Sequence, residues 1–195
     1  MNKIILDKES VINLCIKENT LCNIDKKYKI KELNIELENN VKFILNHYNE
    51  IEEQDLKINI IQKNNSELIY NHSFKNRKKY NLEINIYLIG NCSKNTINIK
   101  GISEGGLSNI KIDGEVKENT SNNELFEKVH ILNLNEGKTN IYPNMFIDTK
   151  NVIANHAASI TNINKDYLFY LNSKGIKDEK AKELIIESFL NNEAR

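Results

Sequence analysis

The sequence predicts an all-β protein that ends in a helical hairpin, on three observations. From about residue 29 to residue 162 apolar residues recur mainly at every second position, and β-branched residues dominate these runs. Stretches rich in Asn, Ser, Lys and Gly separate the runs, with no helical pattern between them. After residue 162 the apolar spacing changes to that of a helix.

The first segment, residues 1–28, carries one weak helical signal. Ser10 would cap a short helix with Val11, Leu14 and Cys15 on one face. Charged residues interrupt the apolar ones near the N-terminus, so we expect no signal peptide. Because no apolar run approaches the roughly 20 residues of a membrane-spanning helix, we also expect no membrane partner.

The clearest strand covers residues 82–88, where polar residues separate Leu82, Ile84, Ile86 and Leu88. A doubly wound α/β fold is excluded, since it needs helices between such strands. A sandwich or barrel would show tight Asn-Gly or Asp-Gly hairpins, and Asp113-Gly114 alone fits. A β-solenoid stacks its strands and uses Asn-rich corners whose amides can form ladders. No strict short repeat is visible, so the pattern favours the solenoid and leaves the sandwich or barrel open.

Two helices are predicted after the strands. Asn164 would cap a helix running from residue 166 to residue 173, and Gly175 would end it. A second helix is expected from Asp178, with acidic residues in its first turn. One packing face of this helix would consist of Ala181, Leu184, Ile185, Ser188 and Phe189.

Composition excludes several functions. The 27 basic and 27 acidic side chains cancel, which argues against a nucleic-acid partner, and the basic cluster at residues 75–79 is interpreted as a solvated loop. Three cysteines without framework spacing indicate a reducing compartment, hence a cytoplasmic protein. Phosphate-loop, zinc and serine-nucleophile motifs are absent from the sequence, so we expect a protein that is not an enzyme.

Two segments carry a family resemblance. Residues 143–160 read PNMFIDTKNVIANHAASI and resemble the most recognisable stretch of the SufB and SufD proteins. Residues 166–176 read DYLFYLNSKGI and are similar to the family's LFYL-x-S-R-G-I. The resemblance is specific over residues 97–192 and implies a right-handed parallel β-helix, that is, a β-solenoid, with a C-terminal α-helical hairpin. The expected divisions are residues 1–28, the β-helix at 29–162 and the helical segment at 163–195.

The resemblance also implies a function. The chain would be a component of a SUF-type iron–sulfur cluster assembly complex, as scaffold or scaffold partner. A SufB/SufD-like partner or a second copy would pair with the last turns of the β-helix. A SufC-like ATPase, the ABC-type ATPase of that system, would dock on the helical segment. The docking residues implied are Tyr170, Leu171, Gly175, Ile176, Leu184 and Phe189.

The candidate cofactor and metal ligand is His156, which matches the histidine that SufD places at its interface with SufB. From spacing alone, a single histidine beside Ala154 and Ala157 is more often structural. Cys92 is a second candidate ligand, with an ordinary corner residue as the alternative. Ala157 after His156 makes the chain look more like SufD than SufB.

Iron–sulfur clusters are commonly held by four cysteine thiolates, which this chain does not supply at ligand spacing. We therefore expect a transient cluster shared with a partner and none bound by the isolated chain. The alternative function is a β-solenoid protein–protein interaction module that keeps the fold and has lost cluster chemistry. The absence of cysteine beyond Cys92 favours this alternative, whereas His156 favours cluster assembly.

Overall fold

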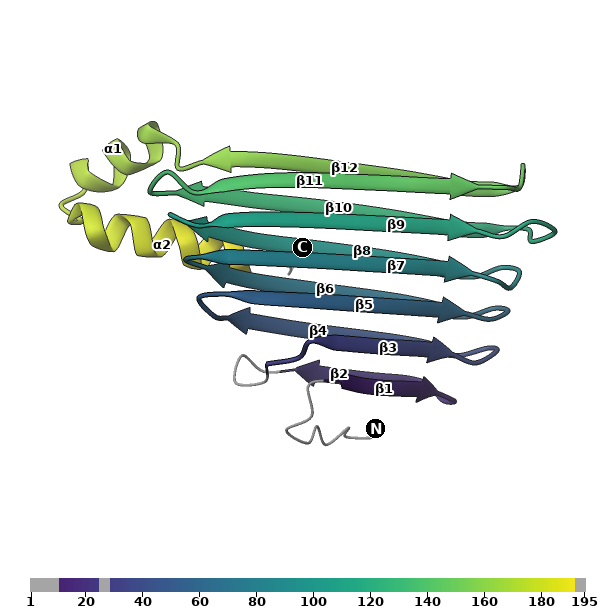
Figure 1. Ribbon diagram of the computed structural model, residues 1–195. Helices are drawn as coiled ribbons and strands as arrows, with labels where there is room; N and C mark the ends of the chain where they lie inside the picture. The colour runs from purple at the N-terminus through teal and green to yellow at the C-terminus, as the bar shows by residue number, and fades with distance from the viewer. Residues whose placement is uncertain (1–10, 25–28, 192–195) are drawn as a thin grey trace.

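The computed structural model describes residues 11–24 and 29–191, in which twelve strands and two helices form (Figure 1). The strands make two six-stranded parallel sheets, and the chain alternates between them. Sheet A contains β1 (Val11–Ile16), β3 (Glu32–Leu37), β5 (Gln54–Gln62), β7 (Lys79–Leu88), β9 (Leu107–Val116) and β11 (Lys138–Ile147). Sheet B contains β2 (Thr20–Ile24), β4 (Lys42–Glu50), β6 (Glu67–Asn76), β8 (Lys94–Glu104), β10 (Asn123–Leu134) and β12 (Val152–Asn162).

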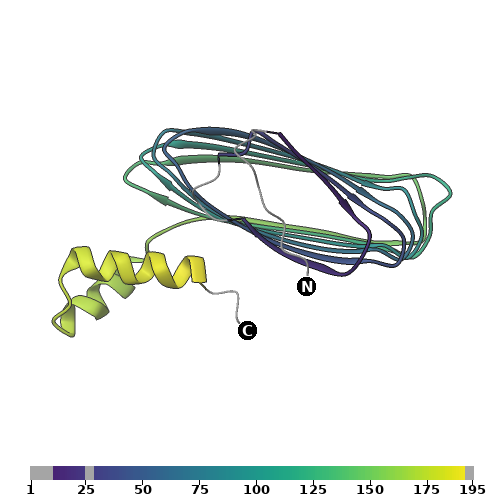
Figure 2. The same cartoon turned by 90° about the horizontal axis from the view of Figure 1, so that it is seen from below.

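Each pair of successive strands forms one turn of a flattened solenoid (Figure 2). Parallel pairing between alternate strands requires the chain to cross to the other sheet after every strand, so the hairpins of a sandwich or barrel do not occur in the described residues. The prediction of a parallel β-solenoid with C-terminal helices is confirmed.

Apolar side chains stacked in rows fill the interior between the sheets. Leu33, Ile58, Ile84 and Ile112 stand directly above one another in sheet A, and each is fully buried. Successive residues of a strand face opposite sides of the sheet, so every second residue points into the interior. The apolar residues at every second position of the sequence are these interior residues. Full burial of each such side chain stabilises the fold by about 1.5–3 kcal/mol.

Asparagine side chains form ladders along the outer faces of both sheets. In sheet A, Asn34 donates to Asn13 at 2.9 Å, Asn59 to Asn34 at 2.7 Å and Asn85 to Asn59 at 3.0 Å. A second ladder in sheet B joins Asn23, Asn46, Asn71 and Asn98. The expected corner ladders are present too, for example Asn65 to Asn40 at 3.0 Å. Stacking in register explains why an Asn-rich sequence suits this fold.

The prediction of a short helix at Val11, Leu14 and Cys15 is wrong. Residues Val11–Ile16 form β1, which pairs in register with β3, so that Ile12 lies on Leu33 and Leu14 on Ile35. Apolar residues three and four apart fit a helix, yet the neighbouring strand offers six backbone partners and an apolar surface. The β-helix thus begins before residue 29, and Ser10, the expected cap, lies outside the described residues.

The helical hairpin follows the prediction closely. Helix α1 (Lys165–Ser173) is capped by Asn164, whose side chain accepts a hydrogen bond from the Asp166 N–H at 2.8 Å. Gly175 follows it with φ of 82°, a conformation that favours glycine. Helix α2 (Asp178–Asn191) lies against the outer face of sheet B, where it contacts β8 (Figure 2). Neither helix of the described residues is long and apolar enough to cross a membrane.

Only part of the predicted packing face of α2 is buried. Ala181 is fully buried, and Ile102 of β8 and Leu132 of β10 are buried on the sheet face that the helix covers. Ile185 and Phe189 are half-buried, whereas Leu184 and Ser188 are exposed. The hairpin therefore keeps an uncovered apolar surface.

Candidate functional site

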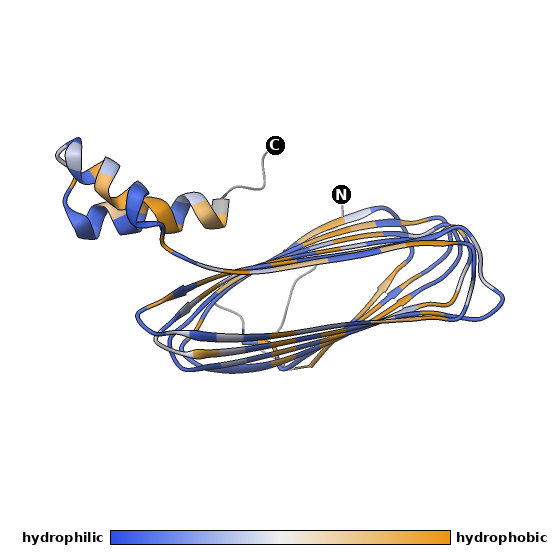
Figure 3. Ribbon diagram, turned by 90° about the horizontal axis from the view of Figure 1, so that it is seen from above, coloured by the Kyte–Doolittle hydropathy of each residue, from blue (hydrophilic) through white to orange (hydrophobic). Residues whose placement is uncertain are grey.

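The C-terminal end of the solenoid is open. Strands β11 and β12 are the last of their sheets, and no strand of the described residues pairs with their outer edges. Ile141, Pro143 and Met145 of β11 are in register with interior positions of β9, yet they are only half-buried. Figure 3 looks onto this end and shows the helices lying to one side of it. The last strands therefore present unpaired backbone groups and a partly uncovered interior at this end of the described residues.

His156 lies on the last turn and faces the interior. It is in register with Glu127 of β10, which belongs to the inward series Leu125, Glu127 and Val129. Residues in register on parallel strands share a face, so His156 stacks above Glu127. The imidazole is exposed because no further turn covers it in the described residues. His156 is thus accessible from the open end.

Glu127, directly beneath, was missed by sequence reasoning. It is 3% exposed, and neither carboxylate oxygen has a hydrogen-bond partner among the described residues. Its Oε1 would lie 2.7 Å from a Cβ on Gly114, so the carboxylate occupies space that a side chain there would fill. Burial raises the pKa of Glu127 to about 8, with a smaller contribution from the negative charge of Asp113. The available signal was an acidic residue at an apolar position of an alternating strand.

Cys92 lies at a corner of the solenoid, exposed, with φ of 57°. Asn65 and Asn122 hold the same left-handed conformation at neighbouring corners, and all three donate their N–H to the next turn. Cys92 is on the turn of β8, two strands of sheet B before β12, so the structure does not bring it together with His156. Within the described ranges, no three His, Cys, Asp or Glu side chains form a metal-binding group.

Two other histidines are buried inside the solenoid. His72 donates from Nδ1 to the His47 carbonyl oxygen at 3.1 Å and accepts from the Tyr80 hydroxyl at 2.7 Å through Nε2. The Nδ1 of His47 is 3.1 Å from the Tyr70 hydroxyl. Burial lowers the pKa of His47 to about 4 and the pKa of His72 well below its usual value. Both are neutral core residues.

The helical hairpin carries an apolar groove of about 410 Å³. It is lined by Tyr167, Tyr170, Leu171, Leu184, Ile185, Ser188 and Phe189. Four of the six predicted docking residues meet there, whereas Gly175 and the half-buried Ile176 lie in the connecting turn outside the lining. Tyr167, Phe169 and Tyr170 are each at least 60% exposed, so aromatic surface is concentrated on α1.

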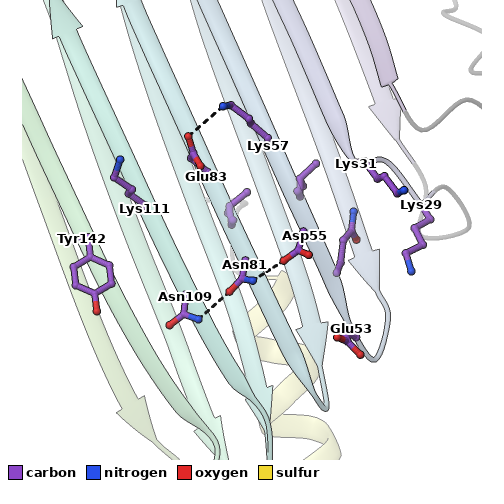
Figure 4. A pocket seen from close by; sticks show the side chains of 13 residues that line it. Lys29, Lys31, Glu53, Asp55, Lys57, Asn81, Glu83, Asn109, Lys111 and Tyr142 are labelled. Atoms are coloured by element: carbon purple, nitrogen blue, oxygen red, sulfur yellow. Dashed lines mark hydrogen bonds and ion pairs between the residues drawn. The ribbon is translucent and has the colours of Figure 1, made fainter.

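A wider hollow, about 830 Å³, lies across the outer face of sheet A (Figure 4). Charges of both signs line it, and several are paired: Lys57 lies 3.5 Å from Glu83, and Lys111 pairs with Asp113. Asn81 donates a hydrogen bond to Asp55 at 2.5 Å. The basic cluster at residues 75–79 is likewise paired, for example Lys75 with Glu104 at 3.1 Å. Both surfaces fit solvated faces and neither forms a basic patch for nucleic acid.

The comparisons with known proteins agree with this architecture. The family model for the SUF system FeS cluster assembly, SufBD core domain, matches residues 3–189. An iron–sulfur cluster assembly SufBD family protein, ycf24, of Galdieria sulphuraria is 35% identical over 104 residues, which is 52% of this chain and 47% of that protein. The SufD protein of Bacillus subtilis is 30% identical over 112 residues, 56% of this chain and 26% of its own length.

The SufB protein of the same organism is 30% identical over 88 residues, covering 45% of this chain and 16% of the relative. The matches thus span less than half the length of these curated relatives. The family model, however, covers nearly the whole chain, including both sheets and the hairpin. The chain therefore belongs to the SufBD family of SUF-system iron–sulfur cluster assembly proteins.

Proposed function

We propose that this chain acts in iron–sulfur cluster assembly as a scaffold or scaffold partner, together with a SufC-like ATPase. The observation that carries this proposal is the family match over residues 3–189. The chain's own features support a binding role rather than catalysis, since its two uncovered apolar surfaces suit partners. Three free thiols in the described residues fit a reducing compartment such as the cytoplasm.

The hairpin groove is the proposed docking site for the ATPase. Exposed aromatic side chains of α1 provide the large, rigid contact area that dominates many interfaces. Helix α2 adds Leu184 and Phe189 to the groove. Helix α2 is anchored to sheet B through Ala181, so the groove is held in place relative to the solenoid. The nucleotide would bind to the partner in this arrangement.

The open end of the solenoid is the proposed site for a SufB/SufD-like partner or a second copy. His156 lies on this turn, so a cluster formed there would be shared across the interface. Because the described residues bring no thiolate to the last turn, the partner must supply cysteine ligands. The isolated chain is then expected to purify without a cluster.

The second candidate function, an interaction module without cluster chemistry, is favoured by the position of Cys92 away from the last turn. Anaerobic reconstitution of the paired complex separates the two. If the chain acts in cluster assembly, the reconstituted complex should contain iron and sulfide. His156→Ala should lower the amount of both while pairing persists. A complex that pairs and never acquires iron establishes the module.

Co-elution with the SufC-like ATPase of the same host tests the docking proposal. Tyr170→Asp places a charge in the groove, and co-elution is expected to fall by about tenfold or more. Tyr142→Asp is the matched control, because Tyr142 is exposed to 54% against 60% for Tyr170 and lies on sheet A. Equal co-elution of both folded variants would overturn the groove as the docking site.

A further inference from the structure

The buried carboxyl of Glu127 makes no hydrogen bond to another described residue. A buried polar group is nearly always hydrogen-bonded, because an unpaired one loses its hydration without compensation. Both Glu127 oxygens lack a hydrogen-bond partner among the described residues. Its neighbours in the same inward series, Leu125 and Val129, are apolar. An apolar side chain there would stabilise the solenoid better. The carboxyl is therefore a buried ligand-type group with no partner among the described residues.

Three residues with donor side chains lie on the two turns nearest the open end, close to Gly114 in the stack. Glu127 reaches over Gly114 from the opposite sheet, and the missing side chain makes the room. On the next turn, Met145 lies in register above Gly114 and His156 in register above Glu127. Adjacent parallel strands are about 4.8 Å apart, so the carboxylate of Glu127 and the imidazole of His156 belong to neighbouring positions of sheet B. The thioether of Met145 comes from the facing sheet, on the same turn as His156.

We propose that Glu127 and His156 are the in-chain ligands of a labile site for a divalent first-row transition metal, entered from the open end. Carboxylate oxygen and imidazole nitrogen are both ligands of Fe²⁺ and its neighbours. Met145 borders the site as a soft, weak donor. Two firm ligands leave several coordination positions free, so the ion exchanges readily and accepts sulfur ligands from a partner.

This inference deepens the proposed function and rests on it for the identity of iron as the relevant ion. Binding of the metal itself depends on residues of this chain alone. The competing explanation is a cationic side chain of the partner that inserts through the open end and neutralises Glu127. That explanation requires no metal binding by the isolated chain.

The test is anaerobic titration of the purified chain with Co²⁺, read by its d–d absorption, and with Fe²⁺, read by calorimetry. The wild type is expected to bind one ion saturably, and Glu127→Gln and His156→Ala to bind about tenfold or more weakly. Glu115→Gln and His130→Ala are the matched controls: both residues are in the outward series of β9 and β10, and their affinities should stay within about twofold.

A second measurement locates the ion. His156→Cys replaces the imidazole with a thiolate and should add a near-ultraviolet cobalt–thiolate band to the spectrum. Absence of saturable binding by the wild type, or equal affinity in Glu127→Gln, overturns the site. Co-elution with the ATPase is measured on the same preparations, so loss of the metal site with intact co-elution leaves the proposed function standing.

Discussion

The interior contains buried bases and a buried acid, and they give the stability opposite pH dependences. His47 and His72 are neutral bases whose charged form is excluded from the interior. Glu127 is an acid whose charged form is penalised in the same way. Their pKa values therefore move in opposite directions, and so does the pH dependence that each contributes.

Acid should destabilise the solenoid through its histidines. The pKa of His47 falls from 6.5 to about 4 on folding, so the unfolded state binds more protons between these values. The contribution is complete above pH 6.5 and is lost as pH falls toward 4, by about 3 kcal/mol for His47. Urea unfolding at pH 7 and pH 5, in a Glu127→Gln background, measures it.

Removal of an interior histidine tests the origin of this pH dependence. His47→Leu should reduce it, since the titrating group is gone. Equal unfolding free energies at pH 7 and pH 5 would contradict the assignment of the interior histidines as neutral.

Glu127→Gln should raise stability at neutral pH by about 1–3 kcal/mol, measured in the presence of a chelator. The pKa of the carboxyl is raised from 4.5 to about 8, so its ionisation in the unfolded chain favours unfolding as pH rises between these values. The gain should grow from pH 5 to pH 8. Glu115→Gln, on the outer face, should change stability little. A loss of stability in Glu127→Gln would show an undetected partner.

At the scale of the elements, the asparagine ladders are continuous hydrogen-bonded chains. Asn59 both donates to Asn34 and accepts from Asn85, whereas Asn13 only accepts from Asn34 in its ladder. Interior members thus take part in two side-chain bonds and the terminal one in a single bond.

Asn59→Ala is expected to lower the free energy of unfolding by about 1–2 kcal/mol, since two neighbouring amides lose a partner. Asn13→Ala is the matched control and should have about half that effect or less. Thermal and urea unfolding measure the free energy of unfolding of the two variants. Equal losses would mean that the ladder behaves as independent surface groups.

The elements differ in how well the sequence reveals them. Period-two apolar runs predict the interior rows, and Asn164 and Gly175 bound α1 through local chemistry that needs no tertiary context. Val11–Ile16 is too short for its apolar spacing to separate a strand from a helix, and pairing with β3 decides it. The sequence shows Glu127 only as an acidic residue at an apolar position of an alternating strand. That its carboxyl is buried and unpaired depends on the fold, which places it over Gly114 of the facing sheet and under His156.

At the scale of the whole molecule, the open turn of β11 and β12 should determine assembly. Ile160 is in register with the fully buried Ile131 and is 47% exposed at this end. Ile160→Lys is expected to weaken pairing with a partner or a second copy by about tenfold or more, measured by light scattering across concentrations. Ile89→Lys is the control, because Ile89 is 45% exposed and lies away from this end.

Unaltered pairing in Ile160→Lys, with pairing lost in Ile89→Lys, would move the interface away from the last turn. If the wild-type chain is monomeric at every concentration and binds no partner in its host, the proposal of a pairing surface is wrong.

The stacking of near-identical turns has a consequence for how the molecule is made. In the part of the chain that the structure describes, the main contacts of each turn are with the turns beside it. Folding is therefore a nearest-neighbour process that nucleates in one place and propagates along the stack. A partner that adds strands to β11 and β12 continues this stacking with strands of a second chain. Association should therefore slow amide hydrogen exchange in the last turn first. The protection should then extend to β9 and β10.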